Sequence, residues 1–298
     1  MKKLISLILS LVLMFSFAAA GAEISEADVN SLIAEMDIMS GYPDGEFYPD
    51  LPVTRAQFAK IAVNASKYKN MVAPGIATSP FADVTYSHWA APYIKVASVN
   101  KLILGYPDST FLPENTVTLA EAVTVAVKLL GYTDSDFSTS WPYGQMGVAT
   151  NIGLLDSIDG GMNDPLTRAE VRTLIYNTLR ADVKDSGNEY ISTLGYSVVE
   201  DVILIATNNE NASVGAGKVY TSSGTYETDG NFNPADVGRR GDIIVKEGKI
   251  KLFFDSAQVS HSYTVYSATN NDVIVYSDGG LTNLDLDKSV KAYYNLQE

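Results

Sequence analysis

The chain contains no cysteine and only two histidines, His88 and His261. Disulfide bonds and a lipid-modified cysteine are therefore excluded. Gly-x-Ser-x-Gly, phosphate-loop and His-Glu-x-x-His motifs are also missing, so most catalytic classes lack their usual residues. We expect no enzyme, no metal site and no cofactor. A structural Ca²⁺ at the turns of Asp44 and Asp108 has no spaced carboxylate loop to support it.

Basic residues are scarce, with 21 Lys and Arg against 35 Asp and Glu and a formal net charge of −14. This charge disfavours nucleic acid or an anionic membrane as a partner. A long apolar run occurs only at Leu4–Phe17, after Met1-Lys2-Lys3 and before the small residues that end at Ala22. The pattern predicts a signal peptide over residues 1–22, because a spanning helix needs about 20 apolar residues. We expect a secreted protein that is not held in a membrane after cleavage.

Two motifs recur at one offset of about 64 residues, which indicates duplication. The segment 41–47 (GYPDGEF) recurs at 105–111 (GYPDSTF), and 53–57 (VTRAQ) recurs at 117–121 (VTLAE). A third, more divergent copy has LTRAE at 166–170 and a Trp141–Leu155 segment that aligns with Trp89–Ile103. We define copy 1 as residues 23–70, truncated at its start, copy 2 as 79–133 and copy 3 as 137–181.

Each copy predicts two helices joined by a Pro/Gly turn. The expected helices are Val29–Met39, Thr54–Tyr68, Tyr93–Leu104, Thr118–Leu130, Gln145–Leu155 and Thr167–Leu179. After a linker at 182–190, residues 191–298 change to β-branched and aromatic runs and predict a small antiparallel β domain. The expected strands are Ser197–Thr207, Lys218–Thr228, Asp242–Phe254, Ser262–Tyr266, Asp272–Tyr276 and Ser289–Asn295, with a hairpin turn at Lys246–Lys249. The fold class is α+β.

The motifs resemble the S-layer homology domain over about residues 23 to 181. The matching segments are Phe81-Ala82-Asp83-Val84, His88-Trp89-Ala90, Gly105-Tyr106-Pro107-Asp108 and the repeated Thr-Arg-Ala-Glu/Gln. The resemblance implies a three-repeat helical bundle with pseudo-threefold symmetry. It also implies that grooves between repeats bind a secondary cell-wall polymer, often pyruvylated, on the wall of a Gram-positive, clostridial-type bacterium.

The Thr-x-x-Glu/Gln spacing is that of a capping box, which supplies partners for free N–H groups at a helix start. Three such pairs occur, and we assign them a capping role: Thr54 with Gln57, Thr118 with Glu121, and Thr167 with Glu170.

Arg55 and Arg168 need another explanation, because a cation in the first helical turn opposes the helix dipole. A guanidinium beside free backbone N–H groups can bind a carboxylate, such as that of a pyruvate ketal. A salt bridge to an acid of a neighbouring copy is the alternative. Leu119 occupies the same place in copy 2, so we expect only one or two working grooves.

The other candidate polysaccharide-binding residues are two tryptophans, an acid and two glycines. Trp89 and Trp141 share a position and either stack on sugar or lie in the core. Asp83 either binds ligand hydroxyls or caps the following turn. Gly41 and Gly105 are expected to close helices and to let a ligand approach the backbone.

Our leading hypothesis is a structural, S-layer-like surface protein that is anchored non-covalently to the wall, with self-association through the β region. The alternatives are an adhesin or glycan-binding module on the same anchor, and a small wall-modifying glycosidase whose paired carboxylates no sequence motif reveals.

Overall fold

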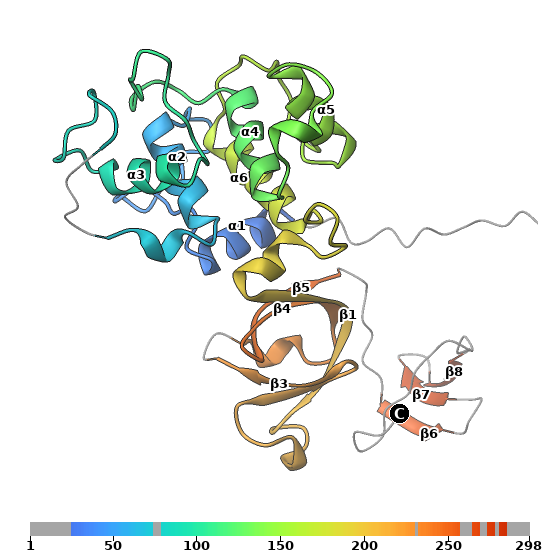
Figure 1. Ribbon diagram of the computed structural model, residues 1–298. Helices are drawn as coiled ribbons and strands as arrows, with labels where there is room; N and C mark the ends of the chain where they lie inside the picture. The colour runs from blue at the N-terminus through green and yellow to red at the C-terminus, as the bar shows by residue number, and fades with distance from the viewer. Residues whose placement is uncertain are drawn as a thin grey trace, which may run out of the picture.

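The computed structural model describes residues 25–73, 79–229, 232–256, 264–268, 273–277 and 280–284. The expected signal peptide, His261 and the expected strand Ser289–Asn295 lie outside the described residues. A helical part is followed by a β part, so the α+β class is confirmed (Figure 1).

Six α-helices form in the described part of residues 25–181. They are α1 Glu26–Glu35, α2 Arg55–Asn64, α3 Ala91–Val99, α4 Leu119–Leu129, α5 Tyr143–Asn151 and α6 Arg168–Arg180. All six expected helices are present, but α1, α2, α3 and α5 end several residues earlier than the apolar periodicity predicts.

The early ends of α1, α3 and α5 share one cause, a residue with a left-handed backbone directly after the C-cap. Asp37, Lys101 and Gly153 have φ values of 50°, 57° and 77°. The next residue in each copy donates its N–H to a carbonyl five positions earlier, which is the Schellman closure. These bonds run from Ile38 to Ile33 (3.0 Å), from Leu102 to Ala97 (2.9 Å) and from Leu154 to Ala149 (2.9 Å). The expectation that Gly41 and Gly105 close the helices is therefore wrong.

A ring of backbone hydrogen bonds joins the three copies just before α2, α4 and α6. The Val53 N–H donates to the Leu166 carbonyl (2.9 Å), the Leu166 N–H to the Val117 carbonyl (3.0 Å), and the Val117 N–H to the Val53 carbonyl (2.9 Å). All three residues are buried. Because each copy donates to one neighbour and accepts from the other, the N-termini of α2, α4 and α6 are held side by side.

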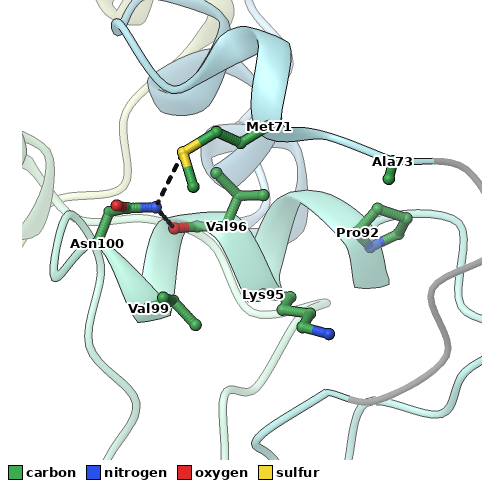
Figure 2. Close-up of a pocket in the computed structure, with 7 residues that line it drawn as sticks. All are labelled: Met71, Ala73, Pro92, Lys95, Val96, Val99 and Asn100. Carbon is green, nitrogen blue, oxygen red and sulfur yellow. Dashed lines mark hydrogen bonds between the residues drawn. The ribbon is translucent and has the colours of Figure 1, made fainter.

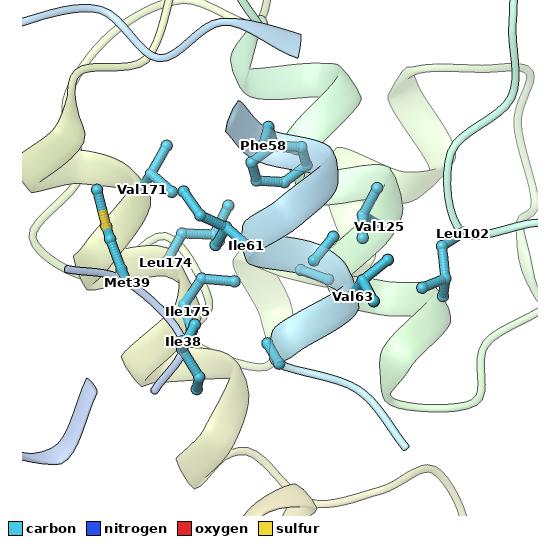
Figure 3. Packing of buried hydrophobic residues seen from close by; sticks show 14 of the residues in the cluster. Ile38, Met39, Phe58, Ile61, Val63, Leu102, Val125, Val171, Leu174 and Ile175 are labelled. Carbon is cyan, nitrogen blue, oxygen red and sulfur yellow. The ribbon is translucent and has the colours of Figure 1, made fainter. Parts of the chain in front are cut away.

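Apolar residues from all three copies fill the centre of this bundle. Ile61 of α2 packs near Val171 and Leu174 of α6 (Figure 3), and none of these side chains is more than 4% exposed. Full burial of such a side chain stabilises the fold by about 1.5–3 kcal/mol. The core therefore fixes the relative positions of the helix starts that carry the candidate residues.

Five strands of the β part form a closed barrel in the order β1-β2-β3-β5-β4. They are β1 Tyr196–Thr207, β2 Lys218–Thr221, β3 Gly224–Thr228, β4 Arg240–Lys246 and β5 Lys249–Asp255. The hairpin between β4 and β5 is confirmed, with φ values of 52° at Glu247 and 76° at Gly248 that suit a two-residue turn. Two expectations are wrong: the run 218–228 is a hairpin of two strands, and β3 pairs with β5 in parallel.

A separate antiparallel sheet contains β6 Thr264–Ala268, β7 Val273–Ser277 and β8 Gly280–Leu284. Its first two strands follow the expected β runs, while β8 was not expected.

Residues 182–190, expected to be a linker, pack against the bundle. Asp182 and Glu189 form a β-bridge, and Arg180 pairs with Glu189 at 2.8 Å. Tyr190, 6% exposed, donates its hydroxyl to the Ala65 carbonyl at 3.0 Å. One apolar core continues from the helices into the barrel through Tyr190, Ile191, Tyr196, Ile244 and Phe254. The bundle and barrel are thus joined by a common core.

Candidate functional site

The capping residues lie at the N-termini of α2, α4 and α6, with Arg55 and Arg168 directly after the caps of α2 and α6, and each helix start forms both hydrogen bonds of a capping box. The bonds from the Thr N–H to the Gln57, Glu121 and Glu170 side chains measure 2.9, 3.0 and 2.7 Å. The reciprocal bonds to the hydroxyls of Thr54, Thr118 and Thr167 measure 3.2, 3.4 and 3.3 Å. A lost cap of this kind costs about 1 kcal/mol.

Arg55 lies inside the protein, with 4% of its surface exposed. Its Nε–H donates to the Phe111 carbonyl at 2.8 Å, and Nη2 donates to the Leu104 carbonyl at 3.3 Å. Nη1 pairs with the Glu121 carboxylate of copy 2 at 2.7 Å. The same carboxylate accepts from the Tyr106 hydroxyl at 2.9 Å. Arg55 thus has the salt bridge to a neighbouring copy that the sequence left open as the alternative to a ligand.

Arg168 has an equivalent environment with 5% of its surface exposed. Its Nε–H donates to the Phe47 carbonyl and Nη2 to the Ser40 carbonyl, both at 2.7 Å. The guanidinium lies 4.7 Å from the ring centres of Tyr42 and Phe47. These four contacts come from three residues of copy 1, and Arg55 makes the same four contacts with their counterparts in copy 2, Leu104, Tyr106 and Phe111.

The two arginines differ in their counter-charge. The residue that corresponds to Glu121 is Gln57, a neutral amide, and no carboxylate lies within ion-pair distance of Arg168 in the described part of the chain. Burial lowers the pKa of Arg168 from its usual value, while the phenol of Tyr42 opposes that shift. An arginine stays charged in proteins, so Arg168 is a buried cation whose charge remains available to an anion.

Arg168 and Gln57 line a cavity of about 410 Å³. Its wall also contains Ile38, Met39, Ser40, Gly41, Tyr42, Pro43, Lys60, Ile61 and Trp89. We call this cavity the Arg168 groove. It combines two cations, Arg168 and Lys60, with an indole that is 53% exposed, and this combination can bind an anionic group and a sugar face together.

The helix start of copy 2 has no comparable cation. Leu119 takes the place of the arginine and is 3% exposed, so it packs in the core. Its neighbour Glu170 accepts only from Thr167 among the bonds of the described residues. An anion has no positive partner at this position.

The two tryptophans lie at the surface and not in the core. Trp89 stacks against His88 with ring centres 5.9 Å apart. Trp141 is 56% exposed and donates its indole N–H to the Thr124 hydroxyl at 3.0 Å. Thr124 stands in α4 where Lys60 stands in α2, so both indoles lie over the same part of a helix in adjacent copies.

Asp83 and Gly105 contribute to packing. The exposed Asp83 carboxylate accepts the N–H groups of Phe111 (2.9 Å) and Leu112 (2.7 Å), so it does not cap the turn that follows it, and its contact with ligand hydroxyls stays a prediction. A Cβ on Gly105 would lie 2.0 Å from the Phe81 ring, so an aromatic side chain, and not a ligand, approaches this glycine. Gly41, by contrast, lines the Arg168 groove.

A second, smaller pocket of about 130 Å³ lies beside α3 (Figure 2). Its wall is formed by Met71, Ala73, Pro92, Lys95, Val96, Val99 and Asn100. The Asn100 amide already donates to the Val96 carbonyl at 2.8 Å. This mainly apolar wall offers few groups that could orient a sugar.

Sequence reasoning missed Lys60 and Tyr42. Tyr42 belongs to the repeated Gly-Tyr-Pro-Asp motif, so its repetition was a usable signal. Lys60 aligns with Thr124 and Thr173, and only the fold brings it beside Arg168.

No group of three acidic or histidine side chains that could hold a metal ion occurs among the described residues. Within the same residues, no helix has the length and apolar character needed to cross a bilayer.

Comparison with known proteins agrees with this architecture. Residues 27–59 and 80–123 match the model of the S-layer homology domain. The chain is 29% identical over 182 residues to the middle cell wall protein of Brevibacillus brevis, covering 60% of this chain and 17% of that protein. It is 26% identical over 314 residues to a cell surface protein of Thermoanaerobacter kivui, and this alignment covers 93% of this chain and 40% of that protein.

A third relative is the cellulosome-anchoring protein of Acetivibrio thermocellus, 34% identical over 91 residues, which cover 30% of this chain and 20% of that protein. The chain thus spans less than half the length of each of these relatives. Two segments of its helical part thus match the S-layer homology domain, and these matches together with the named relatives indicate a secreted protein of the cell surface or wall.

Proposed function

We propose that the helical part anchors this protein non-covalently to the cell wall by binding a secondary cell-wall polysaccharide in the Arg168 groove. The observation that carries the proposal is the buried Arg168 guanidinium, which has a cavity in front of it and Gln57 in place of a carboxylate. A guanidinium binds a carboxylate through two parallel hydrogen bonds. A pyruvylated sugar would supply this carboxylate and also a ring that can lie on Trp89.

The three copies are proposed to form a pseudo-threefold bundle. The hydrogen-bond ring of Val53, Val117 and Leu166 supports this arrangement, because each copy makes the same bond to the next. The side chains beside this ring differ between the copies, so we assign the main binding site to one groove.

For the whole protein we propose a structural role at the cell surface and not a catalytic one.

The test is co-sedimentation with purified cell wall. We would use residues 23–298 and not the helical part alone, because the barrel shares the bundle's core through Tyr190 and Ile191. Wall that carries its secondary polymer should retain the chain, and wall stripped of that polymer should not. Equal retention on both preparations would refute the proposed function.

A further inference from the structure

One position, the third residue of the helices α2 and α4, differs in charge between two arginine sites that share the same carbonyl and aromatic contacts. At Arg55 the position holds Glu121, whose carboxylate lies 2.7 Å from the guanidinium. At Arg168 it holds Gln57, which lines the same cavity as the guanidinium. The carbonyl and aromatic contacts of the two arginines correspond one by one, so the sites differ in the charge of this residue and in Lys60, whose place in α4 is taken by Thr124.

The hydrogen bonds of the two residues are consistent with this distinction. The Glu121 carboxylate accepts from Arg55, the Tyr106 hydroxyl and the Thr118 N–H, so its oxygens are occupied. Gln57 accepts the Thr54 N–H through its oxygen and directs its amide N–H₂ to the Tyr42 hydroxyl at 3.3 Å. Gln57 therefore serves as a cap without placing negative charge at Arg168.

We infer that this residue selects which groove accepts an anionic sugar: Gln57 keeps Arg168 available, whereas Glu121 occupies Arg55 as an internal carboxylate. The inference rests on the proposed function and adds the determinant of its specificity. In the Arg55 site the protein's own carboxylate takes the place that an acidic sugar takes in the Arg168 groove. An anionic ligand would have to displace a buried ion pair there, while in the Arg168 groove it would complete one.

The chain offers matched substitutions. Gln57→Glu introduces a carboxylate next to Arg168, and Gln57→Ala removes the amide without adding charge. Glu121→Gln gives the Arg55 site the neutral amide that Arg168 has naturally, with Thr124 in the place of Lys60. Glu170→Gln makes the same chemical change at the equivalent position of α6, in a set of copies where Leu119 takes the place of the arginine, and is the control.

We would measure the affinity and stoichiometry of residues 23–298 on polymer-bearing wall, with thermal unfolding of each variant to verify folding. Gln57→Glu should lower the affinity by about tenfold or more, which corresponds to about 1.4 kcal/mol. Glu170→Gln should stay within about threefold of the natural chain, and Gln57→Ala, which removes a groove and capping side chain without adding charge, should lose less affinity than Gln57→Glu does. Glu121→Gln should add a second set of sites to the binding isotherm.

The outcomes separate the two ideas. If folded Gln57→Glu binds like the natural chain while stripped wall still fails to retain either, anchoring stands and the selection by charge is overturned. Equal losses of affinity in Gln57→Glu and Gln57→Ala would also overturn the selection by charge, because the shape of the side chain and not its charge would then explain the weaker binding. If Glu121→Gln does not fold, the Gln57 pair decides alone.

Discussion

Replacing each buried arginine by methionine separates the structural from the ligand-binding role of the shared motif. Arg55→Met and Arg168→Met each lose two hydrogen bonds to carbonyls that correspond between the copies. Methionine keeps an unbranched chain that can pack on the neighbouring rings. Only Arg55→Met leaves a carboxylate without its cation, since Glu121 is 20% exposed and pairs with no other basic residue in the described part.

The difference between the unfolding free energies of the two variants therefore estimates the contribution of the ion pair between Arg55 and Glu121. Breaking a fully buried pair costs about 3–5 kcal/mol, and the partial exposure of Glu121 reduces that value. Arg168→Met, in addition, removes a buried cation that lacks a counter-charge, which offsets part of its loss. We expect Arg55→Met to lower the free energy of unfolding by about 1–3 kcal/mol more than Arg168→Met does.

Urea unfolding of residues 23–298, followed by circular dichroism, would measure both free energies, and wall co-sedimentation would measure retention. Arg168→Met should lose retention while it stays folded, and folded Arg55→Met should keep it. A double-mutant cycle with Glu121→Gln should give a coupling energy with Arg55 of about 0.5–3 kcal/mol. Equal destabilisation of both variants with no coupling would refute the assignment of Arg55 to a structural salt bridge.

Three further predictions concern the rest of the fold. Tyr190→Phe should lower the free energy of unfolding by about 1–2 kcal/mol, because the Ala65 carbonyl loses its donor at the junction of bundle and barrel. Thr167→Ala should cost about 1 kcal/mol in urea unfolding, and Thr167→Ser should restore most of it. The hydrogen bond from Lys184 holds the pKa of Asp136 at about 2, below its usual 3.8. The stabilisation from the ionised Asp136 is present above pH 4 and is lost as the pH falls towards 2. Between pH 4 and pH 2 the urea midpoint of Asp136→Asn should therefore fall less than that of the natural chain.

Local patterns in the sequence predicted the features that depend on near neighbours. A Thr and a Glu or Gln three positions apart are enough to form a capping box, so the starts of α2, α4 and α6 were correctly placed. The ends of α1 and α3 were not, because Asp37 and Lys101 adopt a left-handed backbone that usually favours glycine. The fold imposes these two conformations, and the residue types do not indicate them.

The different roles of Arg55 and Arg168 also depend on tertiary structure. Both arginines follow a Thr and precede an Ala, so their local sequences are alike. The decisive partner of Arg55 lies 66 positions away, in the first turn of α4 in the next copy. Gln57 and Glu121 were visible as a difference in the sequence, but only the ring that joins neighbouring copies reveals that each one faces the arginine of the preceding copy. The parallel pairing of β3 with β5 was missed for the same reason.

A single ionic groove limits how tightly one chain can bind the wall. Charge-assisted hydrogen bonds contribute about 1.5–3 kcal/mol each, while association costs about 4–15 kcal/mol in lost freedom of motion. One Arg168 groove thus gives a reversible bond, and several linked grooves give an avidity larger by about 10²–10⁴. Self-association through the β part would supply such linkage between chains. Glu121→Gln would supply a second groove within one chain. We expect this variant to dissociate from polymer-bearing wall more slowly than the natural chain, which would show that the charge at position 121 affects the strength of anchoring.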